Sequence, residues 1–149
     1  MALDPSKDLK EIKDKILSDN QKMENYFESK YIKNRDGELK GGVDEKKYKD
    51  GSLYKGSLVD GKRSGKGIYH YSNGDKYIGD WKDDKFHGKG IYIFNRGDRY
   101  EGELSGGMKS GYGRYYYVNG NRYEGEWMND KKHGEGMYNY HLSGESYKG

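Results

Sequence analysis

The chain has 149 residues, enough for one domain, and 31% of them are hydrophobic. Its mean hydropathy of -1.33 excludes a thick aliphatic core, but seventeen tyrosines supply rings from which a core can be built. The 28 basic and 25 acidic residues are interspersed, which excludes the basic stripe of a nucleic-acid-binding protein, and the lack of cysteine excludes disulfides and thiolate metal sites.

Residues 1–30 are predicted to form an amphipathic helix. Asp4 and Pro5 favour a helix start, as N-cap and first helical residue. Apolar residues then recur at helical spacing in a narrow stripe that Asn20 interrupts: Leu9, Ile12, Ile16, Met23 and Phe27. We expect about 24 helical residues, roughly 36 Å long. They would pack on the chain's own sheet, on a second copy or partner, or, least favourably given the mixed charges, on a membrane.

The rest of the chain repeats with a period of 23 residues. Each unit has a tyrosine, a glycine two residues later, a leucine or tryptophan two further on, then a Gly-x-Gly pair and a second tyrosine. The first tyrosines are Tyr54, Tyr77, Tyr100 and Tyr123, and the leucine or tryptophan is Leu58, Trp81, Leu104 or Trp127. Such a period indicates a repeat architecture, in which each unit buries its face against its neighbours.

The predicted domain boundaries follow this period. Residues 1–30 form the helix, and residues 31–149 form the repeat domain, with units 31–53, 54–76, 77–99, 100–122, 123–146 and the start of another at 147–149. Unit 31–53 is degenerate, because Lys33, Asp44 and Lys46 replace two glycines and the second tyrosine. Terminal repeats are often atypical because they cap the stack.

Each unit is expected to be a β-hairpin. Two stretches per unit alternate with a period of two residues, as strands do, and turns such as 72–75 separate them. The connections are too short for parallel crossovers, so successive hairpins would pair in antiparallel order. The expected fold class is therefore an all-β repeat, a single-layer antiparallel β-meander of stacked hairpins, with an N-terminal amphipathic α-helix.

The same alternation divides the predicted sheet into two faces. One face combines rings and glycines, and a ring such as Tyr69 would lie between Gly56 and Gly79, because glycine has no side chain in its way. The other face carries a thinner apolar strip on which the helix could dock: Ile68, Ile78, Ile91, Ile93 and Met137.

The repeated unit resembles the MORN repeat. The pattern is Tyr-x-Gly-x-Trp/Leu, six residues, Gly-x-Gly-x-Tyr, and then Asn-Gly-Asp or a similar turn, and residues 77–99 and 123–146 carry it closely. The resemblance is strong over 54–149 and weak over 31–53, and does not include the helix. It implies a groove lined by the repeated aromatics and a role in interaction or dimerisation, often in membrane-associated or cytoskeletal assemblies. Phospholipid binding is also attributed to these repeats.

The aromatic face is the candidate partner-binding groove. A single sheet has no second layer behind this face, and a large exposed aromatic patch normally marks an interaction site. For part of the set the alternative is a purely structural role, with rings that cover glycines and one another. The candidate residues are Tyr54, Tyr69, Tyr71, Tyr77, Trp81, Tyr92, Phe94, Tyr100, Tyr115, Tyr117, Tyr123, Trp127, Tyr138 and Tyr140.

A second candidate surface is a basic edge for anionic lipid or an acidic partner. The period aligns the turns that carry Lys62, Arg63, Lys82, Lys85, Lys109, Lys131 and Lys132. Basic residues near an anionic membrane each contribute about 1 kcal/mol. However, Asp60, Asp83, Asp84 and Asp130 lie among them, which favours an ordinary solvated edge.

Binding is the expected function, and catalysis is not expected. The Gly-x-Gly pairs precede strands rather than a helix, unlike nucleotide loops, so we expect no cofactor and no metal site. The sequence predicts a protein–protein scaffold whose aromatic groove holds a helical or extended partner segment or the chain's own helix. Homodimerisation through free edge strands is also expected. The alternatives are a phospholipid-binding module and a regulatory module of a larger enzyme. The expected location is the cytoplasm, either free or attached to the surface of a membrane or to the cytoskeleton.

Overall fold

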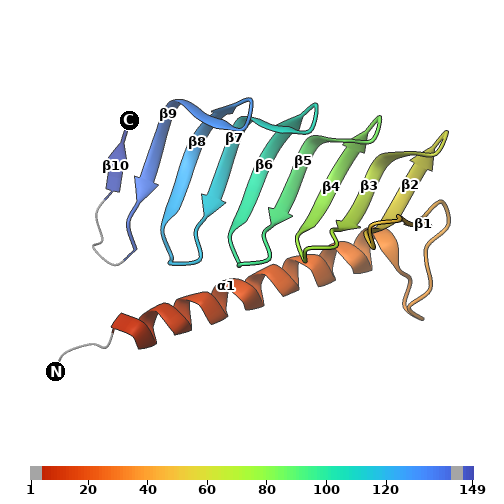
Figure 1. Cartoon of the computed structure of the whole chain (residues 1–149), viewed down its shortest axis with the longest axis horizontal. Helices are drawn as coiled ribbons and strands as arrows, with labels where there is room; N and C mark the ends of the chain where they lie inside the picture. Colours follow the sequence, from red (N-terminus) through yellow and green to blue (C-terminus); the bar gives the residue numbers. More distant parts are fainter. Residues whose placement is uncertain (1–4, 142–145) are drawn as a thin grey trace.

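The computed structural model describes residues 5–141 and 146–149 (Figure 1). Helix α1 (Pro5–Phe27) begins at Pro5, as expected, whereas the expected N-cap, Asp4, lies outside the described residues. A short π-helix, η1 (Glu28–Ile32), continues α1 and ends in the fully buried Ile32. These two elements carry the chain to one end of the sheet, and an isolated bridge between Lys33 and Leu39 precedes the first strand.

The remaining chain forms one antiparallel sheet of ten strands in sequential order. This is the predicted single-layer meander of hairpins. The strands are β1 (Asp44–Lys47), β2 (Leu53–Val59), β3 (Lys62–His70), β4 (Lys76–Lys82), β5 (Lys85–Ile93), β6 (Arg99–Ser105), β7 (Met108–Tyr116), β8 (Arg122–Met128), β9 (Lys131–Asn139) and β10 (Ser146–Lys148).

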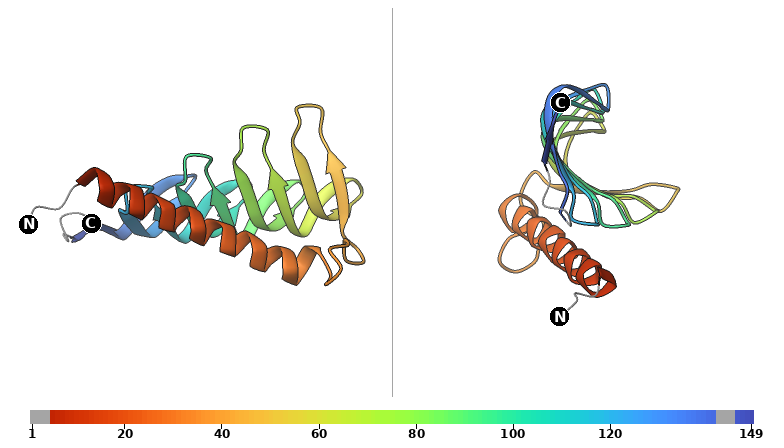
Figure 2. Two further views of the ribbon diagram at one scale, coloured as in Figure 1. Left: turned by 90° about the horizontal axis from the view of Figure 1, so that it is seen from below. Right: turned by 90° about the vertical axis from the view of Figure 1, so that its left-hand side faces the viewer.

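The sheet is curved, and α1 lies outside the curve. Figure 2 shows this arrangement from the end of the sheet, with the strands bent around one side and the helix on the other. We call the concave side the inner face and the convex side the outer face. The tyrosine–glycine positions belong to the inner face, because the isoleucines that contact the helix region belong to the outer one.

A tight turn and a bulge set the register of each hairpin. In the first full repeat Asp60 and Gly61 have positive φ, and Val59 pairs with Lys62. A bulge after Gly56 then shifts the register, so that Gly56 meets Gly67. The same shift recurs in the hairpins β4–β5, β6–β7 and β8–β9.

This register places tyrosine opposite tyrosine and glycine opposite glycine. Tyr69 pairs with Tyr54 and Tyr77, and Gly67 pairs with Gly56 and Gly79. The prediction that Tyr69 lies between Gly56 and Gly79 is therefore wrong. The Tyr54 ring covers the glycines instead, since a Cβ added to Gly56 or Gly67 would collide with it.

Two apolar clusters lie on opposite faces of the sheet. On the inner face, buried tyrosines and tryptophans form a continuous cluster from Tyr54 to Trp127. On the outer face a smaller cluster contains Ile32, Ile68, Ile78 and Ile93, with Phe27 and Tyr31 packed against it. The isoleucine strip is therefore the side that the helix region covers.

Polar contacts fix α1 to the turns at one end of the strands. Asn20 is buried, accepts a hydrogen bond from Arg99 Nη1 at 2.8 Å, and donates one to the Gly97 carbonyl at 3.2 Å. Glu24, also buried, pairs with Lys76 at 2.7 Å. The idea that the chain's own helix occupies the aromatic groove is thus wrong, because these contacts hold α1 outside the curve (Figure 2).

Candidate partner-binding surfaces

The first tyrosine of each repeat is a structural residue of the inner face. Tyr54, Tyr77 and Tyr100 are fully buried, and Tyr123 is 7% exposed. Each hydroxyl donates a hydrogen bond to the carbonyl of the residue three positions later, at 2.8 to 3.1 Å. Burial raises the pKa of all four phenols. These rings hold the hairpins together and present almost no surface to a partner.

The two tryptophans lock neighbouring repeats to one another. Trp81 meets Tyr54 and Tyr77 edge to face, with ring centroids 5.5 and 4.9 Å apart, and Trp127 meets Tyr100 and Tyr123 in the same way. Each indole N–H donates to a glycine carbonyl of the preceding hairpin at 3.2 Å. Both tryptophans are buried, and so are Tyr69 and Tyr115.

The accessible part of the predicted groove is a ladder of rings near the turns beside α1. We call these residues the ring ladder: Tyr71, Tyr92, Phe94, Tyr117, Tyr138 and Tyr140. The first five are half-buried, and Tyr140 is 43% exposed. Ring centroids within the ladder, or to the intervening Tyr115, lie 4.6 to 5.9 Å apart, so the ladder runs across all four repeats.

Acidic and amide side chains in the turns hold the ladder in place. Asp75 accepts hydrogen bonds from the Tyr92 hydroxyl at 2.8 Å and from the Asn95 N–H at 2.7 Å. Asp98 does the same for the Tyr115 hydroxyl and the Val118 N–H, both at 2.9 Å. Asn121 occupies the equivalent place one repeat later. These three residues are absent from the sequence-based candidates, although their 23-residue spacing is visible in the sequence.

The predicted basic edge divides into two groups in the structure. Lys62, Lys82, Lys85 and Lys131 are exposed at the turns away from α1. Arg63, Lys109 and Lys132 instead lie over aromatic rings of the inner face, as Arg63 does over Trp81 at 4.7 Å.

Two of the cations over rings also have acidic partners. Arg63 Nε lies 2.9 Å from Asp84 Oδ1, and Lys109 Nζ lies 3.6 Å from Asp130 Oδ1. Partial burial works to raise the pKa of Asp84, but hydrogen bonds from Arg63 outweigh it and lower that pKa. The interleaved aspartates therefore neutralise part of the edge, as the sequence indicated.

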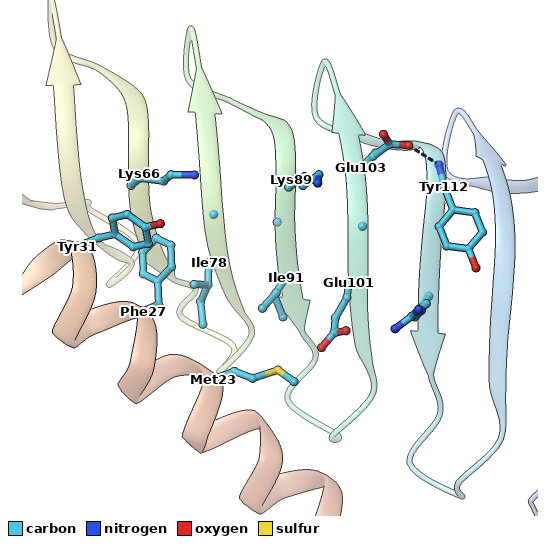
Figure 3. A pocket seen from close by; sticks show the side chains of 14 residues that line it. Met23, Phe27, Tyr31, Lys66, Ile78, Lys89, Ile91, Glu101, Glu103 and Tyr112 are labelled. Carbon is cyan, nitrogen blue, oxygen red and sulfur yellow. Dashed lines mark hydrogen bonds between the residues drawn. The ribbon is translucent and has the colours of Figure 1, made fainter.

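The outer face has a groove of its own beside the helix. Its volume is about 700 Å³, and Figure 3 shows its walls. Met23 and Phe27 from α1 face Ile78 and Ile91 from the sheet, while Lys66, Lys89, Glu101, Glu103 and Arg114 surround this apolar floor. Lys66 pairs with Asp80 at 2.5 Å, and Arg114 lies 3.8 Å from Glu124, so charges of both signs are partnered along the rim.

The described residues offer neither a metal site nor a membrane span. Over 5–141 and 146–149, no three histidine, aspartate or glutamate side chains are grouped so as to hold a metal ion. None of the helices in these ranges combines the length and apolar character needed to cross a bilayer.

Comparison with known families agrees with the repeat geometry. The family model described as MORN repeat matches four consecutive segments, residues 54–76, 77–99, 100–122 and 123–141, which together make up more than half of the chain. The matched segments begin at the four buried first tyrosines. A comparison with curated proteins found no match.

Proposed function

Because the chain belongs to the MORN-repeat family, we propose that it is a non-enzymatic interaction module that holds a partner segment against the ring ladder. MORN repeats are commonly involved in interactions with membranes and proteins. The observation that carries the proposal is the position of α1. Its contacts with the sheet run through the outer face and the turns, so the ring ladder on the inner face is left to a partner.

The ring ladder has the properties of a binding surface. Its side chains are half-exposed aromatic rings, which provide large contact area and lose little conformational entropy on binding. Phenol hydroxyls of Tyr92 and Tyr138 are tied to turn residues, so these rings are already oriented before a partner arrives. An extended or helical segment could lie along the ladder across four repeats.

Lipid binding is the less favoured alternative. Arg63, Lys109 and Lys132 are engaged with rings, and two of them with aspartates, so these contacts weaken the predicted cationic edge although Lys132 remains exposed. Attraction of the exposed lysines to an anionic surface would be screened by salt. Vesicles containing phosphatidylserine should therefore bind weakly, and added salt should abolish that binding.

The proposal is tested with a peptide-display selection against the whole chain. Binders should perturb amide NMR signals of the ring ladder, and Tyr117→Ala should weaken them about 10-fold, which corresponds to about 1.4 kcal/mol. Lys85→Ala, at an exposed turn, is the control and should leave affinity unchanged. Perturbations confined to the outer groove, or tight salt-sensitive vesicle binding, would contradict the proposal.

Self-association through the end strands is a separate proposal. β1 and β10 have one neighbour each in the sheet, and Tyr147 on β10 is 68% exposed. Sedimentation equilibrium of the chain and of Tyr147→Lys tests it. A chain that remains monomeric at high concentration would exclude this mode.

A further inference from the structure

One position of the repeat alternates between two residue types. Leu58, Trp81, Leu104 and Trp127 occupy equivalent places, 23 residues apart. At Trp81 the indole lies among Tyr54, Tyr69 and Tyr77, with Phe86 at 5.1 Å. At Trp127 it lies among Tyr100, Tyr115 and Tyr123, with Lys109 on one side. The fold therefore builds a cradle of tyrosines for an indole ring.

At Leu104 the side chain is smaller, and two of the three counterpart tyrosines, Tyr92 and Tyr100, line the space beside it. Phe86 occupies the position that Arg63 has beside Trp81, and it stacks on Tyr77. A cavity of about 170 Å³ lies there on the inner face, lined mainly by Phe86, Tyr92, Phe94, Tyr100 and Leu104. An engineered apolar cavity of about 150 Å³ in another protein is large enough to bind benzene. The volume at Leu104 is thus sufficient for an aromatic ring.

The glycine that supplies the carbonyl acceptor to each indole also has a counterpart in the repeat of Leu104. Trp81 and Trp127 donate to the carbonyls of Gly67 and Gly113, each fourteen residues earlier. The carbonyl at the same offset from Leu104 belongs to Gly90, which pairs with Gly102 as Gly67 pairs with Gly79.

A cation forms part of the cavity wall. Lys109 and Asp130 form part of its lining, and Lys109 Nζ already lies 5.6 Å from the Tyr100 ring centroid and 5.3 Å from that of Trp127. A ring that entered the cavity would meet the same ammonium group.

We propose that the Leu104 cavity is the anchor pocket of the inner face and receives a tryptophan side chain of the bound partner segment. This inference rests on the proposed function, since the partner is the segment that lies along the ring ladder. Tyr92 and Phe94 belong both to the ladder and to the cavity wall, so a backbone that follows the ladder passes the pocket. The partner's indole would pack against Tyr92 and Tyr100, as Trp81 and Trp127 pack against the equivalent tyrosines of their own repeats.

The first test uses indole and N-acetyltryptophanamide as probes on the whole chain. Both should cause saturable shifts in the methyl signals of Leu104 and the ring signals of Phe86 and Phe94. Leu104→Trp fills the cavity from within and should weaken binding of both probes at least 10-fold. Val59→Trp adds the same side chain at a position that is 59% exposed and should leave probe binding unchanged.

Further variants make the outcome decisive. If Leu104→Trp does not fold, Leu104→Phe, with a smaller ring, replaces it and should weaken probe binding in the same direction. Absence of saturable binding to the wild-type chain, or undiminished binding to the filled variant, would overturn the inference.

The display-selected peptides separate this inference from the proposed function. Peptides with a tryptophan should lose at least 10-fold in affinity for Leu104→Trp. If their affinity is kept in Leu104→Trp but lost in Tyr117→Ala, the ladder binds partners and the pocket is not the anchor. If Tyr117→Ala leaves peptide affinity unchanged while the probes still bind in the pocket, the ring-ladder proposal is wrong and the pocket remains a binding site for an aromatic ring.

Discussion

At the scale of single residues, the fold depends on tyrosine and glycine as a pair. The Tyr100 ring lies over Gly102 and Gly113, whose α-carbons face one another across β6 and β7. No other residue fits beneath the ring, because any Cβ there would occupy the volume of the phenol. Glycine weakens most strand interiors, but here it allows the ring to cover the backbone and remain buried.

Gly113→Ala should therefore be strongly destabilising. The added methyl group would overlap the Tyr100 ring, which is buried and held by its hydroxyl, so ring or backbone must move. We expect the free energy of unfolding to fall by about 2–3 kcal/mol, measured by urea denaturation. Gly41→Ala is the control, since its Cβ would meet no atom within 4 Å, and its effect should stay within about 0.5 kcal/mol. Equal effects of the two substitutions would contradict this account.

At the scale of elements, the junction between α1 and the sheet relies on buried polar contacts. Arg99 is 5% exposed and depends on Asn20 and on Glu101, whose Oε1 lies 3.0 Å from Arg99 Nε. Removal of one partner from such a group leaves a buried charge with fewer hydrogen bonds. The apolar cluster of the outer face holds the helix against the sheet, and these polar contacts fix the position of the helix along it.

Asn20→Ala should loosen the helix without unfolding the sheet. Loss of the Arg99 and Gly97 contacts should cost about 1–3 kcal/mol and raise amide exchange in α1, as measured by hydrogen–deuterium exchange. Lys22→Ala, at an exposed position of the same helix, should leave exchange unchanged. If α1 exchanges as fast as a free peptide already in the wild-type chain, the docked arrangement is wrong.

The elements that the sequence could predict are those governed by local spacing. The two-residue alternation and the 23-residue period place Trp81 and Tyr77 on one face and Ile78 on the other, as observed. The partner of each ring depends on the bulge after Gly56, which alternation alone does not reveal. Asn20 looked like a break in the apolar stripe, because its partner Arg99 is 79 residues away.

The candidate site was predictable in outline but not in depth. The repeated aromatics do share one face, yet Tyr54 and Tyr77 are fully buried and Tyr140 is exposed, a difference that depends on how neighbouring repeats pack. The Leu104 cavity was likewise hidden, although the Leu–Trp alternation was visible, because the size of a cavity depends on all the rings around it.

At the scale of the whole molecule, the buried phenols should make the folded chain less stable at alkaline pH. Burial raises the pKa of Tyr54, Tyr77 and Tyr100 above the value of about 10 for an exposed tyrosine. The unfolded chain therefore loses these protons first as pH rises. The stabilisation is complete below about pH 10 and decreases above it.

The chain should thus unfold cooperatively above about pH 10, with tyrosinate absorbance rising together with loss of the sheet signal in circular dichroism. A Tyr54→Phe variant keeps the ring and removes one ionisable group. Between neutral and alkaline pH its free energy of unfolding should therefore fall by less than that of the wild-type chain. Phenols that all ionise at about pH 10 while the sheet remains intact would contradict the prediction.

The contacts along α1 follow the spacing of the repeats in the sheet. Along α1, Ile12 lies at the Gly120 turn, Asn20 at Gly97 and Glu24 beside Lys76, so helix and hairpins run in opposite directions. The twelve helical residues from Ile12 to Glu24 rise about 18 Å, and the four strands of two repeats span about 19 Å, so about six helical residues correspond to one repeat. The length of the helix is thus matched to the number of repeats: a MORN array with one more hairpin would need about six more helical residues for the helix to reach its last turn.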